Sequence, residues 1–335
     1  MKNGSPEIIV GAGFGSSGLS ALMDLLDEVE GFYTTPQEFA MFNDPDGLIS
    51  LESALIDNWS IFQGNVAIRR FKKLAAALSR RSIGPYPNLD YIKFFGKEFN
   101  QVVEDYVDSL VNIDFIGLSY GVDSLVKRQL NQRVKMLRRS SLTNDKMYVA
   151  NNLTQEEFIE LTQHFVKKLA KLCLEKYEKT SFVFDEGFVS LSLNKVLRYL
   201  PESSKVIVMV RDPRDVYAEL KDSGDAWMFQ PNKIKDFIAY QAAMFKRWEE
   251  QKSYVDNSRF LQVRFDDLIV NYQDEKQRIF EFLSIEEERH VRPLSKLNPN
   301  VSSENVGRWK KNLTALEIAQ MNEGLEEILN SYNWL

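Results

Sequence analysis

The sequence is poor in the residues that build disulfides and metal centres. Its 335 residues include one cysteine, Cys173, and two histidines, His164 and His290. A single cysteine excludes an internal disulfide and any cysteine-based zinc site. Two histidines far apart in the chain argue against a histidine-rich metal site. The composition therefore argues against a metal site built on cysteine or histidine.

Long apolar stretches are also missing. The longest uninterrupted apolar runs, such as Val206–Val210, fall far short of the roughly 18 residues that a membrane-spanning helix needs. The first residues lack the basic flank and apolar stretch of a signal peptide, because Glu7–Val10 already has the pattern of a strand. We expect a soluble, cytoplasmic protein with no membrane span.

A strong excess of one charge is absent as well. Lys and Arg number 42 and Asp and Glu number 48, so the formal net charge is −6, and the sequence pI is about 5.3. Such an acidic chain argues against nucleic acid as a partner. The 44% of hydrophobic and 27% of charged residues are typical of a globular protein and exclude a disordered or fibrous chain.

Short apolar runs alternate with helical patterns. Val206–Val210 is continuous rather than alternating, as in a strand that is covered on both faces. One helix is predicted to begin near Ser17–Ser20. Two more are predicted after Thr154 and Thr314, because each threonine is followed three residues later by a glutamate that completes a capping box. Strands that alternate with helices predict a parallel sheet with helices on both faces. The predicted strands are Ile8–Gly11, Phe182–Asp185, Lys205–Val210 and Phe260–Phe265.

The stretch from about residue 48 to 178 is mostly helical by pattern. It carries three basic clusters, at Arg69–Lys73, Arg80–Arg81 and Arg138–Arg139. We predict a single domain over residues 1–335 in which this stretch is a helical insertion. The clusters fit either a solvated helix face or a rim that attracts an anionic acceptor.

A glycine-rich turn, Gly11–Ser20, follows the first predicted strand and opens the first helix. Backbone N–H groups at such a helix N-terminus form an anion-binding site. The spacing of Gly13, Gly15 and Gly18 fits the dinucleotide fingerprint of flavin and NAD oxidoreductases. The same residues also fit a Walker A pattern whose lysine is replaced by Leu19.

A third interpretation of the turn is a phosphosulfate loop. The stretch Ser16-Ser17-Gly18-Leu19-Ser20 is similar to the loop with which sulfotransferases hold the 5′-phosphosulfate of their donor. A tight glycine turn without any ligand is the remaining alternative. The turn alone does not decide among these four interpretations.

Three later segments, together with the turn, resemble the sulfotransferase family. Lys205–Tyr217 is similar to the family's second signature, in which a buried strand ends in an arginine, here Arg211, that grips the 3′-phosphate of 3′-phosphoadenosine-5′-phosphosulfate (PAPS). Phe265–Leu268, followed by a helix ending at Phe280–Leu283, resembles a second segment of the family. Val306–Lys311 resembles the Gly-x-Trp-Lys loop that closes over the nucleotide. The four pieces occur in the family's order across nearly the whole chain.

The resemblance implies a P-loop-like three-layer α/β fold with a largely parallel central sheet. It also implies transfer of a sulfuryl group from PAPS to a hydroxyl or amine acceptor, a small molecule or a glycan, with carbohydrate favoured, adenosine 3′,5′-bisphosphate as product and no metal. Independently of the resemblance, an arginine at the carboxyl end of a parallel strand points into the crevice where ligands bind, and its planar fork suits phosphate. The resemblance places the donor on Gly15, Ser16, Ser17, Gly18, Leu19, Ser20, Arg211, Gly307, Arg308, Trp309 and Lys310.

Sulfuryl transfer needs one general base, which takes the proton of the acceptor. Glu38 lies 22 residues after Ser16 in a Glu-x-x-x-Phe context similar to that of the catalytic glutamate in sulfotransferases that act on carbohydrate. A glutamate just after Pro36 could instead stabilise a helix N-terminus. His164 falls on an amphipathic helix, and we expect His290 to be exposed in an acidic stretch, so Glu38 is preferred.

Three residues depart from the family's pattern. Ser16 stands where a lysine or arginine usually stabilises the leaving phosphate, Glu219 where a serine usually contacts the 3′-phosphate, and Glu186 where a lysine is expected. A carboxylate about 4 Å from that phosphate would repel it by about 4 kcal/mol at an effective dielectric of ~20. We hypothesise that Glu219 turns away, or pairs with Arg214 or Lys221, so that the donor still binds.

Two other functions follow if that hypothesis fails or the turn has been misread. The departures leave open a noncatalytic protein on the same fold that binds a different nucleotide or a glycan. The glycine spacing leaves open a flavin or NAD oxidoreductase, although that interpretation rests on the turn alone.

Overall fold

A computed structural model describes residues 7–81, 88–117, 145–223 and 233–335. The chain forms two compact units. The first comprises the residues up to Phe39 together with Tyr177–Leu197 and Glu202–Leu335, and the second comprises Ala40–Lys176 with Arg198–Pro201. The expected insertion at about 48–178 falls largely in the second unit, and whether both units make a single domain stays a prediction.

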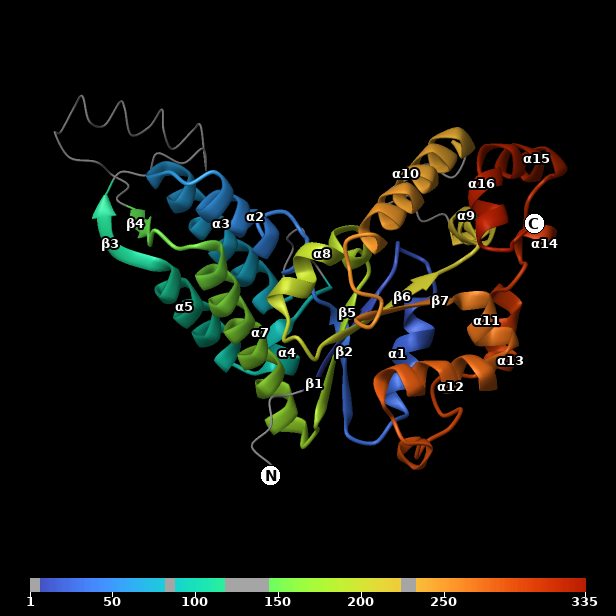
Figure 1. Cartoon of the computed structure of the whole chain (residues 1–335), viewed down its shortest axis with the longest axis horizontal. Coiled ribbons are helices and arrows are strands. Elements are labelled where there is room, and N and C mark those ends of the chain that lie inside the picture. Colours follow the sequence, from blue (N-terminus) through green and yellow to red (C-terminus); the bar gives the residue numbers. More distant parts are fainter. Residues whose placement is uncertain (1–6, 82–87, 118–144, 224–232) are drawn as a thin grey trace. The chain divides into compact units, whose positions relative to one another are not determined.

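The first unit is built on a five-stranded sheet in the order β2-β5-β1-β6-β7 (Figure 1). All neighbouring strands are parallel. The three central strands are almost wholly buried, as their continuous apolar sequences require. The predicted parallel sheet is therefore confirmed, and the four predicted strands form β1, β5, β6 and β7. The strands are β1 (Glu7–Ala12), β2 (Phe32–Glu38), β5 (Ser181–Glu186), β6 (Lys205–Val210) and β7 (Phe260–Arg264).

Helices cover both faces of this sheet. Ile207 of β6 and Val263 of β7 face a core that also contains Leu22 of α1, Leu268 of α11 and Ile279 of α12. Successive side chains of a strand point to opposite faces, and on the other face α10 packs through Trp248, whose ring lies 5.5 Å from that of Phe260. The result is the expected three-layer α/β arrangement. The helices are α1 (Leu19–Asp27), α8 (Leu193–Val196), α9 (Pro213–Ser223), α10 (Ile234–Lys252), α11 (Phe265–Val270), α12 (Tyr272–Leu283), α13 (Pro299–Ser302), α14 (Trp309–Asn312), α15 (Ala315–Gly324) and α16 (Glu326–Ser331), with 3-10 turns at Val189–Ser192, Leu197–Tyr199, Glu287–Arg289 and Ser303–Asn305.

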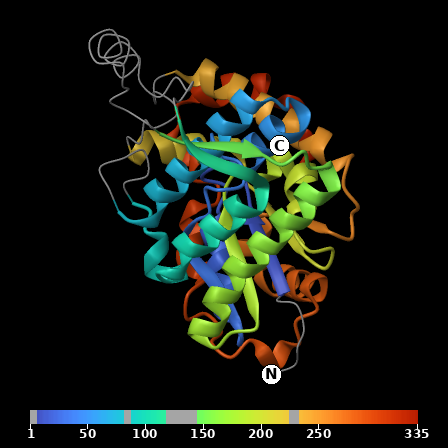
Figure 2. The ribbon, with the colours of Figure 1, turned by 90° about the vertical axis from the view of Figure 1, so that its left-hand side faces the viewer.

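The second unit is mainly helical. The helices α5 and α7 run side by side (Figure 2). Between them, the Tyr106 ring stacks on the Phe165 ring at 4.5 Å, and the Tyr106 hydroxyl lies 2.7 Å from the Thr162 hydroxyl. An antiparallel hairpin of β3 and β4, which the sequence did not predict, completes the unit. Its elements are α2 (Leu48–Glu52), the π-helix Ser53–Asp57, α3 (Ile61–Ser79), α4 (Tyr91–Phe95), α5 (Glu98–Leu110), β3 (Val111–Gly117), β4 (Asp145–Ala150) and α7 (Gln155–Tyr177).

The two predicted capping boxes are confirmed. The backbone N–H of Glu157 donates to the Thr154 hydroxyl at 3.2 Å, and the Glu157 carboxylate accepts from the Thr154 N–H at 2.8 Å. Thr314 and Glu317 repeat this arrangement before α15. Each helix thus begins where the sequence places its start.

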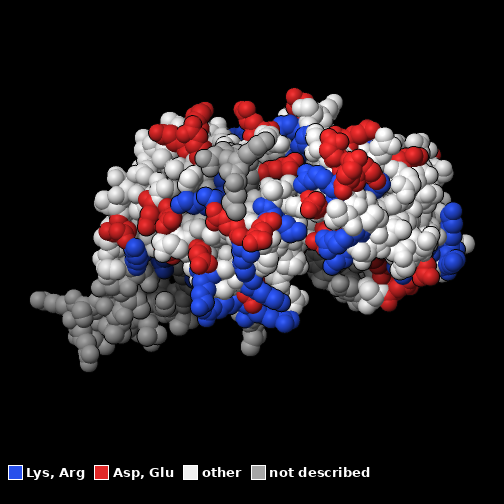
Figure 3. All heavy atoms as spheres, turned by 90° about the horizontal axis from the view of Figure 1, so that it is seen from below, with Lys and Arg blue, Asp and Glu red and all other residues white. Residues whose placement is uncertain are grey.

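Two side chains of the first basic cluster, Arg70 and Lys72, already have acidic partners. Lys72 of the first basic cluster binds Glu104 at 2.6 Å and the Tyr148 hydroxyl at 2.9 Å, and Arg70 lies 3.8 Å from Asp46. Arg138–Arg139 lies outside the described residues. On the face shown in Figure 3, acidic and basic side chains are interspersed. Within the described ranges, no helix combines the length and apolarity needed to cross a bilayer.

Candidate active site

The glycine-rich turn between β1 and α1 has a backbone that requires glycine. Gly15 and Gly18 have φ angles of 75° and 84°, in the left-handed region that favours glycine. A Cβ atom on Gly18 would lie 2.2 Å from the ring of Phe265. Ser16 also has a positive φ of 49°, which is uncommon for a residue with a side chain. The conformation of the turn is therefore tightly specified.

The turn ends at the N-terminus of α1, a helix of nine residues. The first N–H groups of a helix have no partner within it and lie at the positive end of its dipole. Gly18 caps this helix without a side-chain hydrogen bond. The Ser17 hydroxyl turns inward and accepts from the Phe14 N–H at 3.3 Å. The turn thus offers an anion chiefly backbone N–H groups.

Arg211 follows β6 and reaches this turn. Its Nη1 donates to the carbonyl oxygen of Ser16 at 3.1 Å, and its Nη2 donates to that of Asn305 at 3.0 Å. The guanidinium lies 4.9 Å from the centroid of the Phe265 ring. Because β1 and β6 are parallel neighbours, their carboxyl ends bring the turn and the arginine to one edge of the sheet. The structure thus brings the turn and Arg211 into contact.

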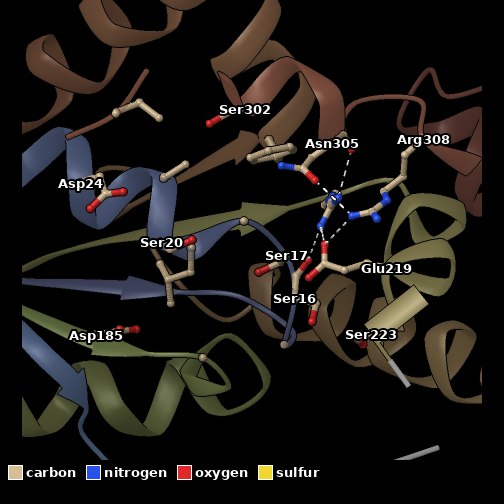
Figure 4. Close-up of a pocket in the computed structure, with 18 of the residues that line it drawn as sticks. Ser16, Ser17, Ser20, Asp24, Asp185, Glu219, Ser223, Ser302, Asn305 and Arg308 are labelled. Carbon is tan, nitrogen blue, oxygen red and sulfur yellow. Dashed lines mark hydrogen bonds and ion pairs between the residues drawn. The ribbon is translucent and has the colours of Figure 1, made fainter. Parts of the chain in front are cut away.

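Glu219 of α9 pairs with Arg211, and in Figure 4 its carboxylate lies beside Arg308. Its Oε2 accepts from Arg211 Nη1 at 2.5 Å and lies 3.9 Å from Arg308 Nη1. The Arg211 side chain is 3% exposed, whereas that of Glu219 is 36% exposed. A buried guanidinium requires a counter-charge, and Glu219 supplies it.

The hypothesis that Glu219 turns away or pairs with Arg214 or Lys221 is therefore wrong. Arg214 is engaged by Asp212 at 2.7 Å, and Lys221 is engaged by Glu317 at 2.8 Å. With both of those cations paired elsewhere, the carboxylate of Glu219 stays beside Arg211.

The loop that follows the Ser303–Asn305 turn is fastened to α9 by Asp215. The Asp215 carboxylate accepts from the N–H groups of Gly307 at 2.8 Å and Trp309 at 2.9 Å. The Trp309 ring centroid lies 4.0 Å from the guanidinium carbon of Arg214 and 5.5 Å from Lys310 Nζ. Burial raises the pKa of Asp215, and these two hydrogen bonds oppose that effect.

A cavity of about 760 Å³ brings most of the predicted donor residues together. Its lining includes the last six residues of the turn, Gly15–Ser20, together with Arg211 and Arg308. Gly307, Trp309 and Lys310 are not among its lining residues. Arg308 Nη2 donates to Asp222 at 2.8 Å. The lining residues are Gly15, Ser16, Ser17, Gly18, Leu19, Ser20, Ala21, Asp24, Asp185, Gly187, Arg211, Glu219, Asp222, Ser223, Phe265, Leu297, Ser302, Asn305 and Arg308.

Glu38 lies at the end of β2, opposite Asp185 of β5. An irregularity in the register between Thr34 and Glu38 precedes it, and such bulges re-aim side chains. Its Oε1 accepts from the Gly187 N–H at 3.2 Å. Because Glu38 ends a strand, it does not stabilise a helix N-terminus.

Asp185 is the carboxylate that sequence reasoning missed. It lines the cavity, whereas Glu38 is not among the lining residues. Burial and, secondarily, the charge of Glu38 raise the pKa of Asp185 to about 6. Its position at the carboxyl end of a predicted strand was the available signal.

Glu186 and His290 take structural roles. Glu186 is 1% exposed, and its carboxylate accepts from the Phe188 N–H at 3.2 Å. The expectation that His290 is exposed is wrong: it is buried, with Nε2 2.7 Å from Glu28 Oε2. Glu28 is fully buried and also accepts from the N–H groups of Leu294, Lys296 and Leu297 at 3.1, 2.7 and 3.0 Å. A buried carboxylate needs such donors, and here they fix the loop that carries Leu297 into the cavity wall.

The described residues contain no group of three or more His, Cys, Asp or Glu side chains placed to hold a metal ion. The cavity's polar groups are instead backbone N–H groups, two guanidinium groups, serine hydroxyls and carboxylates. The N–H groups, guanidinium groups and hydroxyls suit a ligand that carries phosphate or sulfate groups, whereas the carboxylates do not.

Solved structures similar to the chain include several sulfotransferases at low sequence identity. A sulfotransferase domain from the curacin biosynthetic pathway is 14% identical, with a TM-score of 0.44 and coverage of 96% of this chain and 98% of that domain. A sulfotransferase from Mycobacterium avium is 12% identical, with a TM-score of 0.41 and coverage of 98% of this chain and 76% of that protein. Retinol dehydratase in complex with androsterone and inactive cofactor PAP is 14% identical, with a TM-score of 0.39 and coverage of 96% and 80%.

No curated protein matches the chain in sequence. The model of the sulfotransferase family matches residues 115–289, which is more than half of the 335 residues. The matched segment includes β5, β6 with Arg211, and α9 with Glu219. The chain therefore belongs to the sulfotransferase family of enzymes.

Proposed function

We propose that the chain transfers a sulfuryl group from PAPS, the donor that its sequence resemblance implies, to a hydroxyl or amine acceptor in the cytoplasm. A carbohydrate is the acceptor that the resemblance favours. One observation carries the proposal: in a member of this family, the glycine-rich turn, Arg211 and Arg308 line the same cavity. The turn and Arg308 lie outside the segment matched by the family model, so their part in the proposal rests on this geometry.

The polar groups of the cavity suit the two charged groups of a phosphosulfate nucleotide. The N–H groups of the turn and of the first residues of α1 would hold the 5′-phosphosulfate. Arg211 and Arg308 would hold the ribose end, where the guanidinium fork fits phosphate oxygens. Gly307, Trp309 and Lys310, although outside the cavity lining, belong to the loop that carries Arg308 to it.

In the transfer, the acceptor oxygen or nitrogen forms a bond to sulfur while the bond from sulfur to the bridging phosphate oxygen breaks. The electron pair of the broken bond stays on the phosphate, and the proton of the acceptor moves to a carboxylate of the protein. Negative charge therefore accumulates beside the turn, whose N–H groups stabilise it most strongly in the transition state.

Glu38 is the base that we propose, with Asp185 as its partner. The two carboxyl groups lie on adjacent strands, and the charge of Glu38 contributes to the raised pKa of Asp185. Two such groups titrate as a pair. Asp185, with a pKa of about 6, is largely unprotonated at neutral pH, and Glu38 beside it would take the proton of the acceptor.

The experiment is a transfer assay that follows release of adenosine 3′,5′-bisphosphate from PAPS with carbohydrate, phenol and amine acceptors. Replacing Glu38 by Gln should lower kcat by about 100-fold or more. The matched control is Glu250→Gln, since Glu250 is an exposed carboxylate outside the cavity that pairs with Arg247. Nucleotide binding without transfer to any acceptor would instead support the noncatalytic binding protein, and a bound flavin would support the oxidoreductase.

A further inference from the structure

The cavity is lined by more carboxyl groups than cations. Its lining residues include two cations, Arg211 and Arg308, and four carboxyl groups. Burial raises the pKa of two of the four, Asp24 and Asp185. The other two, Glu219 and Asp222, both lie on α9 and pair with the two arginines at 2.5 and 2.8 Å. Each cation that a second phosphate would use is therefore already neutralised.

The donors of Arg211 are also largely engaged. Of the five N–H bonds of a guanidinium group, three donate to Ser16, Asn305 and Glu219. Its Nε is fully buried and has no hydrogen-bond partner among the described residues. Because Nε is buried, only one N–H of Arg211 remains for a phosphate while the Glu219 carboxylate stays in place.

A ribose hydroxyl, unlike a phosphate, can be bound while Glu219 stays paired with Arg211. The Glu219 side chain is 36% exposed at the cavity wall and can accept a hydrogen bond from a ribose hydroxyl while keeping its bond to Arg211. In other nucleotide sites a carboxylate at a ribose hydroxyl favours the free sugar, and an arginine there accommodates a phosphate. In this chain the carboxylate and the arginine are present together and are paired.

We propose that Glu219 makes this site select nucleotides with a free 3′-hydroxyl over nucleotides with a 3′-phosphate. This inference rests on the sulfuryl transfer of the proposed function and changes its donor from PAPS to adenosine 5′-phosphosulfate, which has the same phosphosulfate bond and no 3′-phosphate. Glu219 is thereby the residue that determines donor specificity.

The test is calorimetric binding of adenosine 3′,5′-bisphosphate and of 5′-AMP to the full chain. The unmodified protein should bind 5′-AMP at least as tightly as the bisphosphate. Glu219→Gln, which keeps the shape of the side chain and removes its charge, should tighten binding of the bisphosphate by about tenfold or more. The same substitution should weaken 5′-AMP binding by about threefold to tenfold, because the amide oxygen still accepts a hydrogen bond but is a weaker acceptor than the carboxylate. Glu250→Gln is the charge-matched control and should change neither affinity.

Transfer rates supply a second readout. The unmodified protein should use adenosine 5′-phosphosulfate with a kcat/KM at least equal to that for PAPS, and Glu219→Gln should reverse the order. If the unmodified protein prefers the 3′-phosphorylated ligand by tenfold or more, the inference is overturned, whether or not the variant folds. If neither nucleotide binds and neither donor is used, the proposed function itself fails and the inference fails with it.

Discussion

Asp185 lowers the stability of the fold at neutral pH, and replacing it by Asn should reveal by how much. Burial and the neighbouring Glu38 raise its pKa from 3.8 to about 6. The folded state thus holds the proton more tightly than the unfolded state. As pH rises from about 4 to about 6, unfolding is favoured because the unfolded chain ionises first. The shift of about two pKa units corresponds to about 3 kcal/mol of unfolding free energy that is absent above pH 6.

Asparagine is neutral at every pH and nearly the same size. Asp185→Asn should therefore be more stable than the unmodified protein by up to about 3 kcal/mol at pH 8, and equally stable near pH 4. The assay is urea unfolding at both pH values, with Glu250→Gln as control. Transfer activity should fall in the same variant, since the proposed base pair loses a member. Equal or lower stability of the variant at pH 8 would refute this account of the Asp185 carboxyl.

Three further substitutions test how the site is assembled. Gly18→Ala should lower stability by about 1–3 kcal/mol and weaken nucleotide binding, because φ is positive and the added methyl group meets the Phe265 ring; thermal unfolding and calorimetry measure the two effects. Glu28→Ala should destabilise the fold by about 3 kcal/mol or more in urea unfolding, since it leaves three N–H groups and a buried imidazole without their acceptor. Asp215→Ala should raise hydrogen exchange at residues 306–310 while leaving α1 protected, because it removes the acceptor that fastens that loop.

The parts of the fold that could be predicted are those with local signals. The four apolar runs, the two capping boxes and the glycine-rich turn each occupy a few consecutive residues, and all were located correctly. The strand β2 was missed because Pro36 cannot donate to a ladder, and only its place at the edge of the sheet makes it a strand. The hairpin β3–β4 gave no recognisable signal either, since its strands lie far apart in the chain.

The candidate site was predictable only in part, because its remaining contacts depend on tertiary geometry. The meeting of Arg211 with the turn follows from parallel strands, and the sequence supported it. The pairing of Arg211 with Glu219 depends on the direction in which α9 leaves β6, which no local pattern encodes. Asp185 became a candidate only when the sheet order placed β5 between β1 and β2.

The hydrogen bonds of Arg211 join two loops that are otherwise distant in the chain, one through the Ser16 carbonyl and the other through the Asn305 carbonyl. A ligand that draws this guanidinium toward itself weakens these two hydrogen bonds, which hold together the parts of the cavity wall around Ser16 and Asn305. Tight ligand binding and a rigid cavity wall therefore place opposite demands on Arg211. Substitutions that strengthen the wall of the empty cavity should slow ligand entry. Arg211 is therefore a poor target for stabilising the protein without loss of turnover.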